Sequence, residues 1–134
     1  MSWFILAWQR ATDFSGRSRR KEYWYFQLFN GIVVVFLALF AVAFSDENKP
    51  AMVPLFLMFL YCLVLFVPAL AVTIRRLHDI GRSGWWYFIG FVPLIGGIIL
   101  FVFTLLDSEP CANPWGLDPK ASERVITPPY AMPR

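Results

Sequence analysis

The chain has 134 residues, enough for one domain, and 58% of them are hydrophobic whereas only 16% carry a charge. This apolar composition argues against a water-soluble fold, because a chain this short has too few polar residues to cover its apolar segments. The net charge of +3 would suit nucleic acid, but the cations flank apolar segments, where membrane topology and lipid explain them. We therefore expect a membrane protein with no nucleic-acid partner.

Residues 1–23 form a polar lead that opens on an amphipathic segment. Its apolar residues recur at helical spacing, namely Trp3, Phe4, Ala7, Trp8 and Ala11. This spacing predicts a short helix lying in the membrane interface, and Gly16 is expected to end it. Ser18 is the expected N-cap of the helix that follows.

Three long runs, 24–44, 51–74 and 85–106, contain no Asp, Glu, Lys or Arg. A helix needs about 20 apolar residues to cross a hydrocarbon core about 30 Å thick, and each run is long enough. We therefore predict an all-α integral membrane protein with three transmembrane helices, which occupy residues 24–106.

The third run allows an alternative, because Pro93 followed by Gly96 and Gly97 would let it dip into the bilayer and return. Such a re-entrant backbone needs surrounding protein to satisfy its polar groups, and three helices offer little cover. A full span is therefore the prediction.

The positions of the cations predict the orientation, since lysine and arginine near span ends resist translocation. Eight of them lie in the lead and in the turn after the second run: Arg10, Arg17, Arg19, Arg20, Lys21, Arg75, Arg76 and Arg82. The loop at 45–50 has only Lys49, and the tail cations lie far beyond the third run. We expect the N-terminus and the turn at 75–84 to be cytoplasmic, with the proline-rich tail, 107–134, on the opposite side.

Polar and small residues inside the runs predict helix packing. Gln27, Asn30 and Gly31 share one helical face, which indicates a hydrogen bond between helices, although a polar contact for a substrate or ion remains an alternative. Two small-residue pairs, Ala69 with Thr73 and Gly96 with Gly97, would let another helix approach closely. Because three helices have little interior of their own, a homo-oligomer is expected.

The stretch "TIRRLHDIGRSGWWYF" at 73–88 concentrates charge between two apolar runs. If the second helix continues past residue 74, Arg75, Asp79 and Arg82 lie on one face, and Gly81 ends the helix in a left-handed conformation. Ser83 is expected to cap the next helix. Asp79, with Glu22 at the same depth on the first helix, would orient arginines whose remaining donors bind a phosphate.

We therefore predict a non-enzymatic protein whose basic cytoplasmic face binds anionic lipid headgroups or a membrane protein partner. The predicted binding residues are Arg17, Arg20, Glu22, Arg75, Arg76, His78, Asp79, Arg82, Trp85 and Trp86. In the tail, the stretch "NPWGLDP" is interpreted as a defined turn or docking element.

Two other functions remain open. An enzyme acting on a lipid headgroup would use His78 as base, Asp79 as orienter and the arginines as a phosphate clamp. An immunity-type protector would instead block a membrane-directed toxin. His78 is the only histidine and no cysteine lies near it, so neither a metal nor a cofactor is expected. Cys62 in the second run and Cys111 in the tail are not expected to form a disulfide.

Three stretches, "FSGRSRRKEYWYF", "RRLHDIGRSGWW" and "NPWGLDP", resemble the small bacterial inner-membrane proteins grouped as domain of unknown function 805. The resemblance runs from Phe14 to Pro119 and implies an integral inner-membrane protein. Under the orientation that the cations predict, the tail would then be periplasmic. The resemblance implies no activity, cofactor or substrate. The positions it singles out are Gly16, Arg17, Arg20, Glu22, Trp24, Arg75, Arg76, His78, Asp79, Ser83, Trp85, Trp86, Asn113, Gly116, Asp118 and Pro119.

Overall fold

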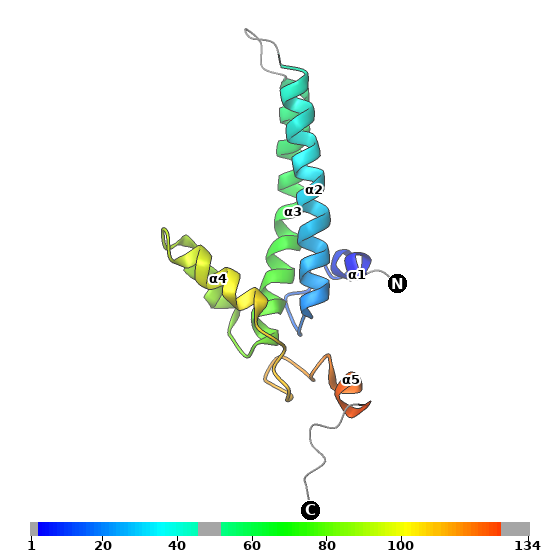
Figure 1. Ribbon diagram of the computed structural model, residues 1–134, viewed down its shortest axis with the longest axis vertical. Coiled ribbons are helices and arrows are strands. Elements are labelled where there is room, and N and C mark those ends of the chain that lie inside the picture. Colours follow the sequence, from blue (N-terminus) through cyan, green and yellow to red (C-terminus); the bar gives the residue numbers. More distant parts are fainter. Residues whose placement is uncertain (1–2, 46–51, 127–134) are drawn as a thin grey trace, which may run out of the picture.

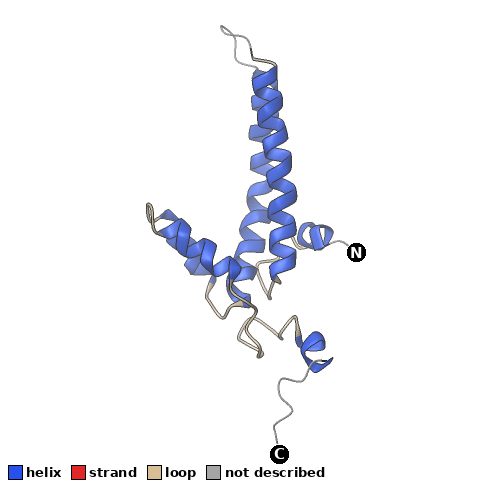
Figure 2. Ribbon diagram, viewed as in Figure 1, coloured by secondary structure: helices blue, strands red, loops and turns tan. Residues whose placement is uncertain are grey.

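The computed structural model describes residues 3–45 and 52–126, and the described part contains helices and loops but no strand (Figure 2). The elements in chain order are α1 (Trp3–Gln9), α2 (Arg20–Ala43), α3 (Met52–Asp79), the 3-10 helix η1 (Gly84–Phe91), α4 (Gly96–Leu105) and α5 (Ala121–Ile126). The all-helical fold predicted from the sequence is therefore found.

Helices α2 and α3 stand side by side as a long pair (Figure 1). Both are long and apolar enough to cross a membrane, and only 17% of the most apolar stretch of each is buried. A helix in the core of a soluble protein would bury most of such a stretch, whereas these helices expose theirs. The exposed apolar side chains need an apolar surrounding, which a lipid bilayer supplies.

The third apolar run does not form the single span predicted over 85–106. It folds into two short elements, η1 and α4, which pack against each other beside the α2–α3 pair (Figure 1). Leu94, with a φ of 67°, reverses the chain between them. Helix α4 has 10 residues, and at about 1.5 Å per residue it covers about half of a hydrocarbon core.

The backbones of η1 and α4, which together form a hairpin, approach each other closely. A Cβ atom on Gly96 would lie 1.8 Å from the carbonyl oxygen of Ile89, so only glycine fits at this position. The sequence assigned Gly96 to contacts with another helix, but the structure uses it inside the hairpin. Gly97 has nothing within 4 Å of its Cβ position and stays open.

Helix α1 is present as predicted and packs across the lower half of α2. Ala7 and Phe26 are fully buried in this contact, and the ring centroids of Phe4 and Phe29 are 4.2 Å apart. The contact buries the apolar face of the amphipathic segment against protein.

Two of the four predicted helix boundaries agree with the structure, and α1 ends at Gln9 rather than at Gly16. Gly81 ends α3 with a φ of 72°, and the Ser83 hydroxyl accepts a hydrogen bond from Trp85 N at 3.4 Å. Ser18 does not cap α2, because Arg19 occupies the N-cap position and no side chain bonds to the first turn.

The described part of the tail, residues 107–126, lies against the charged turn at 75–84. The sequence analysis expected a bilayer to separate these two segments. The backbone nitrogen of Glu109 donates to the carbonyl oxygen of Asp79 at 2.9 Å. Because the hairpin turns back, its two ends meet at the end of α3, and the chain leaves it on the side where it entered (Figure 1). Residues in contact cannot lie on opposite sides of a membrane.

Candidate functional site

A buried charged cluster lies where the lead, the end of α3 and the tail meet. The Asp79 carboxylate pairs with Arg17, whose Nε lies 3.1 Å from Oδ1, and with Arg76 through Oδ2. The hydroxyl of Ser108 donates to the same Oδ2 at 2.5 Å. These three ionic side chains are at most 2% exposed. One carboxylate therefore holds two guanidiniums away from solvent.

A second buried ion pair joins α2 to α3. Arg75 Nη2 lies 3.0 Å from Glu22 Oε1, with side-chain exposures of 0% and 3%. Arg75 Nη1 donates to the carbonyl oxygens of Arg10 and of Asp13, the latter at 2.6 Å. The sequence places Glu22 at the depth of both Arg75 and Arg76, and the structure pairs it with Arg75. The same guanidinium anchors the loop between α1 and α2.

Backbone carbonyls of the hairpin and tail complete the cluster. Arg17 donates to the carbonyl oxygens of Glu109 at 2.6 Å and of Cys111 at 2.7 Å. Arg76 donates to the carbonyl oxygen of Thr104 at 3.3 Å and to that of Leu106. Carbonyls at and beyond a helix end have no partner within the helix, and the arginines supply the missing donors. The cluster therefore fixes the hairpin and the tail to α3.

The guanidinium groups of Arg17, Arg75 and Arg76, which the sequence analysis placed in a headgroup-binding face, are engaged within the protein. Every guanidinium nitrogen of the three, except Arg75 Nε, donates a hydrogen bond to another described residue. The sequence could indicate that carboxylates orient these arginines but not that carbonyl oxygens occupy the remaining donors. Most donors of the three arginines are therefore directed at other parts of the protein, so the cluster has a structural role.

His78 does not form the predicted base and orienter pair with Asp79. Its Nδ1 lies 3.2 Å from the carbonyl oxygen of Gly16, and its ring stacks on Trp115 with the centroids 4.8 Å apart. Both Asp79 oxygens are engaged by arginines and by Ser108, as described above. His78 is 7% exposed, so the tail covers it.

The tail motif is a tight turn that docks on the end of α3. Asn113 and Gly116 exchange backbone hydrogen bonds of 3.0 Å, and Gly116 has a φ of 141°. Asn113 Nδ2 donates to the carbonyl oxygen of His78 at 2.9 Å. Asp118 lies 2.9 Å from Arg124, and the carbonyl oxygen of Pro119 accepts from Arg19.

The predicted packing residues behave differently from one another. Asn30 accepts a hydrogen bond of 2.6 Å from Tyr61 on α3, whereas Gln27 donates to Tyr23 on its own helix at 3.3 Å. Thr73 donates to the carbonyl oxygen of Ala69 within α3 at 2.7 Å. Gly31 faces open space.

Arg82, Trp85 and Trp86 lie at the outer surface of the charged turn. The Arg82 guanidinium carbon is 5.1 Å from the centroid of the Trp86 ring, a cation–π contact. Trp85 is 77% exposed, which suits an aromatic residue at the level of lipid headgroups. These three residues are accessible, but they do not share a pocket with the buried arginines.

The structure adds a basic pocket that sequence reasoning missed in part. It has a volume of about 230 Å³ and lies at the N-terminal end of α2. Its lining residues are Arg19, Arg20, Lys21, Lys120 and Glu123. The sequence analysis selected only Arg20 from this set, because Lys120 belongs to the tail and was expected across the membrane. The run of three cations at 19–21 was the feature of the sequence that could have indicated this pocket.

Hydrogen bonds at the surface around the site lower the pKa values of two aspartates. Hydrogen bonds from Ser15 are the main cause that lowers the pKa of Asp13 to about 2, and Arg10 adds to the effect. The hydrogen bond from Lys120 lowers the pKa of Asp107. In the part of the chain that the structure describes, no three His, Cys, Asp or Glu residues are grouped to hold a metal ion.

Comparisons with known proteins agree with the resemblance noted in the sequence. The model of a family described as "Protein of unknown function (DUF805)" matches residues 11–117. The chain is 42% identical to the inner membrane protein YhaI of Escherichia coli (strain K12) over 120 residues, which are 90% of this chain and 97% of that protein. It is 38% identical to the inner membrane protein YhaH of the same strain, with 90% and 98% covered. No solved structure matches the chain.

Proposed function

Because the chain belongs to the DUF805 family, whose relatives YhaI and YhaH are inner membrane proteins, we propose that it is a small, non-enzymatic protein of the bacterial inner membrane. Its exposed basic end binds anionic lipid headgroups. The observation that carries the proposal is the basic pocket at the foot of α2, where the helix begins its apolar stretch.

Charge in this pocket favours an anion. Four cations line it with one carboxylate, Glu123, and the neighbouring Asp107 pairs with Lys120. Among the described residues no carboxylate lies within 4.0 Å of Arg20 or Lys21, although Asp107 and Glu123 lie near enough to interact with them electrostatically. These two cations are thus the pocket's cations without a direct ion pair. A cation near an anionic membrane surface contributes about 1 kcal/mol of binding energy.

The arrangement of the chain supports a cytoplasmic position for the basic end. The lead, the charged turn and the described tail lie together at one end of the α2–α3 pair (Figure 1). Lys120 and Arg124 in the tail therefore add to the eight cations of the lead and turn on the same side. Under the rule that positively charged ends stay inside, this end faces the cytoplasm.

A lipid-retention experiment tests the proposal. The protein is purified in a mild detergent, and its retained phospholipids are quantified by mass spectrometry. The wild type should be enriched in phosphatidylglycerol and cardiolipin over phosphatidylethanolamine, and the double variant Arg20→Gln/Lys21→Gln should lose this enrichment. Arg10→Gln is the matched control, because Arg10 is a partly exposed cation at the same end that pairs with Asp13 and lies outside the pocket. Equal enrichment in the double variant and the wild type overturns the proposal.

A further inference from the structure

We propose that α2 carries a site for one anionic glycerophospholipid, with its phosphate in the basic pocket and an acyl chain in an apolar groove along the helix. The inference rests on the proposed function and adds a defined place and stoichiometry to it. Its basis is the continuity of three cavities on the same face of α2.

The three cavities share residues from one to the next. The basic pocket and a second cavity of about 430 Å³ are both lined by Arg20 and Lys21. The second cavity and a third, of about 600 Å³, are both lined by Trp24 and Leu28. A ligand seated on this face would therefore pass from cationic to mainly apolar surroundings without a break.

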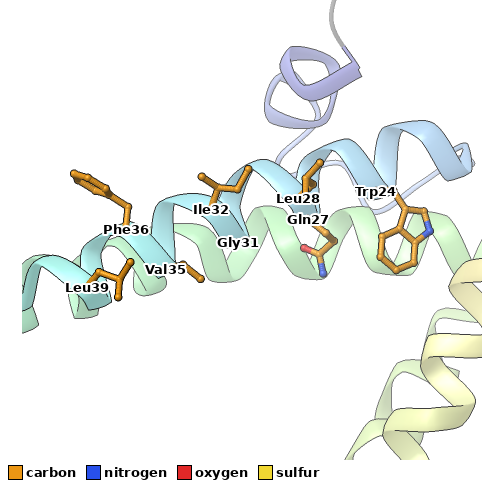
Figure 3. Close-up of a pocket in the computed structure, with 8 residues that line it drawn as sticks. All are labelled: Trp24, Gln27, Leu28, Gly31, Ile32, Val35, Phe36 and Leu39. Carbon is orange, nitrogen blue, oxygen red and sulfur yellow. The ribbon is translucent and has the colours of Figure 1, made fainter. Parts of the chain in front are cut away.

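The third cavity is a shallow groove that follows one side of α2 (Figure 3). Its lining is Trp24, Gln27, Leu28, Gly31, Ile32, Val35, Phe36 and Leu39. Gly31 lies midway along it, and nothing in the protein comes within 4 Å of its Cβ position. The missing side chain leaves room for a hydrocarbon chain to lie against the helix backbone.

The groove is long enough to hold an acyl chain across one leaflet of a bilayer. From Trp24 to Leu39 the helix rises about 22 Å, at about 1.5 Å per residue. Half of a hydrocarbon core about 30 Å thick is about 15 Å. An acyl chain whose phosphate lies beside Arg20 would therefore end near Val35, at the bilayer midplane.

The foot of the groove is built to receive a headgroup. Trp24 is held in place there by α4, since its Nε1 donates to the carbonyl oxygen of Thr104 at 3.4 Å and its ring meets Phe101 edge-on at 5.9 Å. Below it, Arg20 and Lys21 occupy the first turn of α2, where the helix dipole also favours an anion. Charge and apolar length together select a lipid rather than a free phosphate or an apolar helix.

The experiment fills the groove. Gly31→Leu places a side chain in the path of the acyl chain, and its Cβ has no protein atom within 4 Å, so the fold should persist. Gly97→Leu is the matched control, because Gly97 is equally open but lies on α4, away from the groove. Phosphatidylglycerol is titrated into delipidated protein, and native mass spectrometry records the occupancy of a one-lipid adduct. We expect about tenfold weaker binding for Gly31→Leu, corresponding to the lost burial of about two methylene groups, and no change for Gly97→Leu.

A second variant guards against a folding defect. Leu28 is 62% exposed and lines both the second and the third cavity. Leu28→Ala therefore removes part of the lining of the site with little loss of protein stability. It should also weaken the adduct. If Gly31→Leu and Leu28→Ala bind lipid like the wild type while Arg20→Gln/Lys21→Gln does not, the groove is not the acyl site, although headgroup binding stands. If Gly31→Leu instead dissolves a dimer and leaves lipid binding intact, the groove is a contact between two copies and the lipid site is overturned.

Discussion

The Nε of Arg17 lies 3.1 Å from Oδ1 of Asp79, although the two residues are 62 positions apart in the chain. Arg76 shares the same carboxylate, and all three side chains are buried. The pairing links the lead to the end of α3, and through the carbonyls bound by Arg17 and Arg76 it also holds the hairpin and the tail. Asp79 is therefore the centre of the charged end of the molecule.

Removing the Asp79 carboxylate should strongly destabilise this end. Asp79→Asn leaves two buried guanidiniums without a counter-charge, and breaking a buried ion pair in this way costs about 3–5 kcal/mol. Thermal unfolding in detergent, followed by tryptophan fluorescence, measures the loss. Asp13→Asn is the control, because the Asp13 side chain is 34% exposed and its ion pair with Arg10 is on the surface. Similar melting of both variants would contradict a structural role for the cluster.

Gly96 should not tolerate even one added methyl group. In Gly96→Ala the Cβ would collide with the carbonyl oxygen of Ile89, and forcing η1 and α4 apart should cost about 1–3 kcal/mol. Gly97→Ala meets nothing and should be neutral or stabilise α4 by up to about 1 kcal/mol. The two variants are compared by thermal unfolding in the same detergent. Equal stability would mean that the hairpin does not close as described.

Thiol labelling of Cys111 should reveal the side of the membrane on which the tail lies. Cys111 is exposed, and in a Cys62→Ser background it is the only thiol of the chain. A membrane-impermeant maleimide should label it in inverted vesicles but not in intact cells, because the tail shares the side of the charged turn.

The control for this labelling is a thiol at the other end of α2. Cys62→Ser/Cys111→Ser/Ser45→Cys places it there, and it should react in intact cells. Labelling of Cys111 in intact cells, together with protection of the thiol at 45, would reverse the proposed orientation.

The loop between α1 and α2 should lose stability in acid through Asp13. Its folded-state pKa is lowered from 3.8 to about 2, so the carboxylate contributes stability that is present above pH 3.8 and is lost as the pH falls toward 2. The effect should be small, because the carboxylate is partly exposed and solvent screens its interactions. Melting temperatures between pH 2 and 5 should fall less steeply for Asp13→Asn than for the wild type. Parallel curves would show that the Ser15 and Arg10 contacts do not persist in solution.

Local features of the sequence predicted the elements well where the neighbours in the chain decide the outcome. Gly81 ends α3 because a left-handed residue is needed to leave the helix, and Trp3 to Gln9 form a helix because their apolar residues repeat at its period. The common depth of Glu22, Arg75 and Arg76 indicated an ion pair between the first two long helices, and the structure selects Arg75 as the partner.

The third run was predicted less well because its length is compatible with two folds. Twenty-two apolar residues can span a bilayer once or enter and return, and the choice depends on whether protein covers the turned backbone. The contact of Gly96 with Ile89 and the bonds from Arg76 to the end of α4 provide this cover. Neither is visible in the hydropathy of the run.

The sequence by itself determined that the protein is helical, that its apolar segments need a lipid surrounding and that its arginines gather near one end, because periodicity, hydropathy and charge are properties of neighbouring residues. Only the tertiary structure decided which arginines face inward. Arg17, Arg75 and Arg76 are buried because the returning hairpin and tail bring carbonyl oxygens to their donors, whereas Arg20 and Lys21 stay accessible beside Lys120. Such contacts depend on where distant segments meet in space.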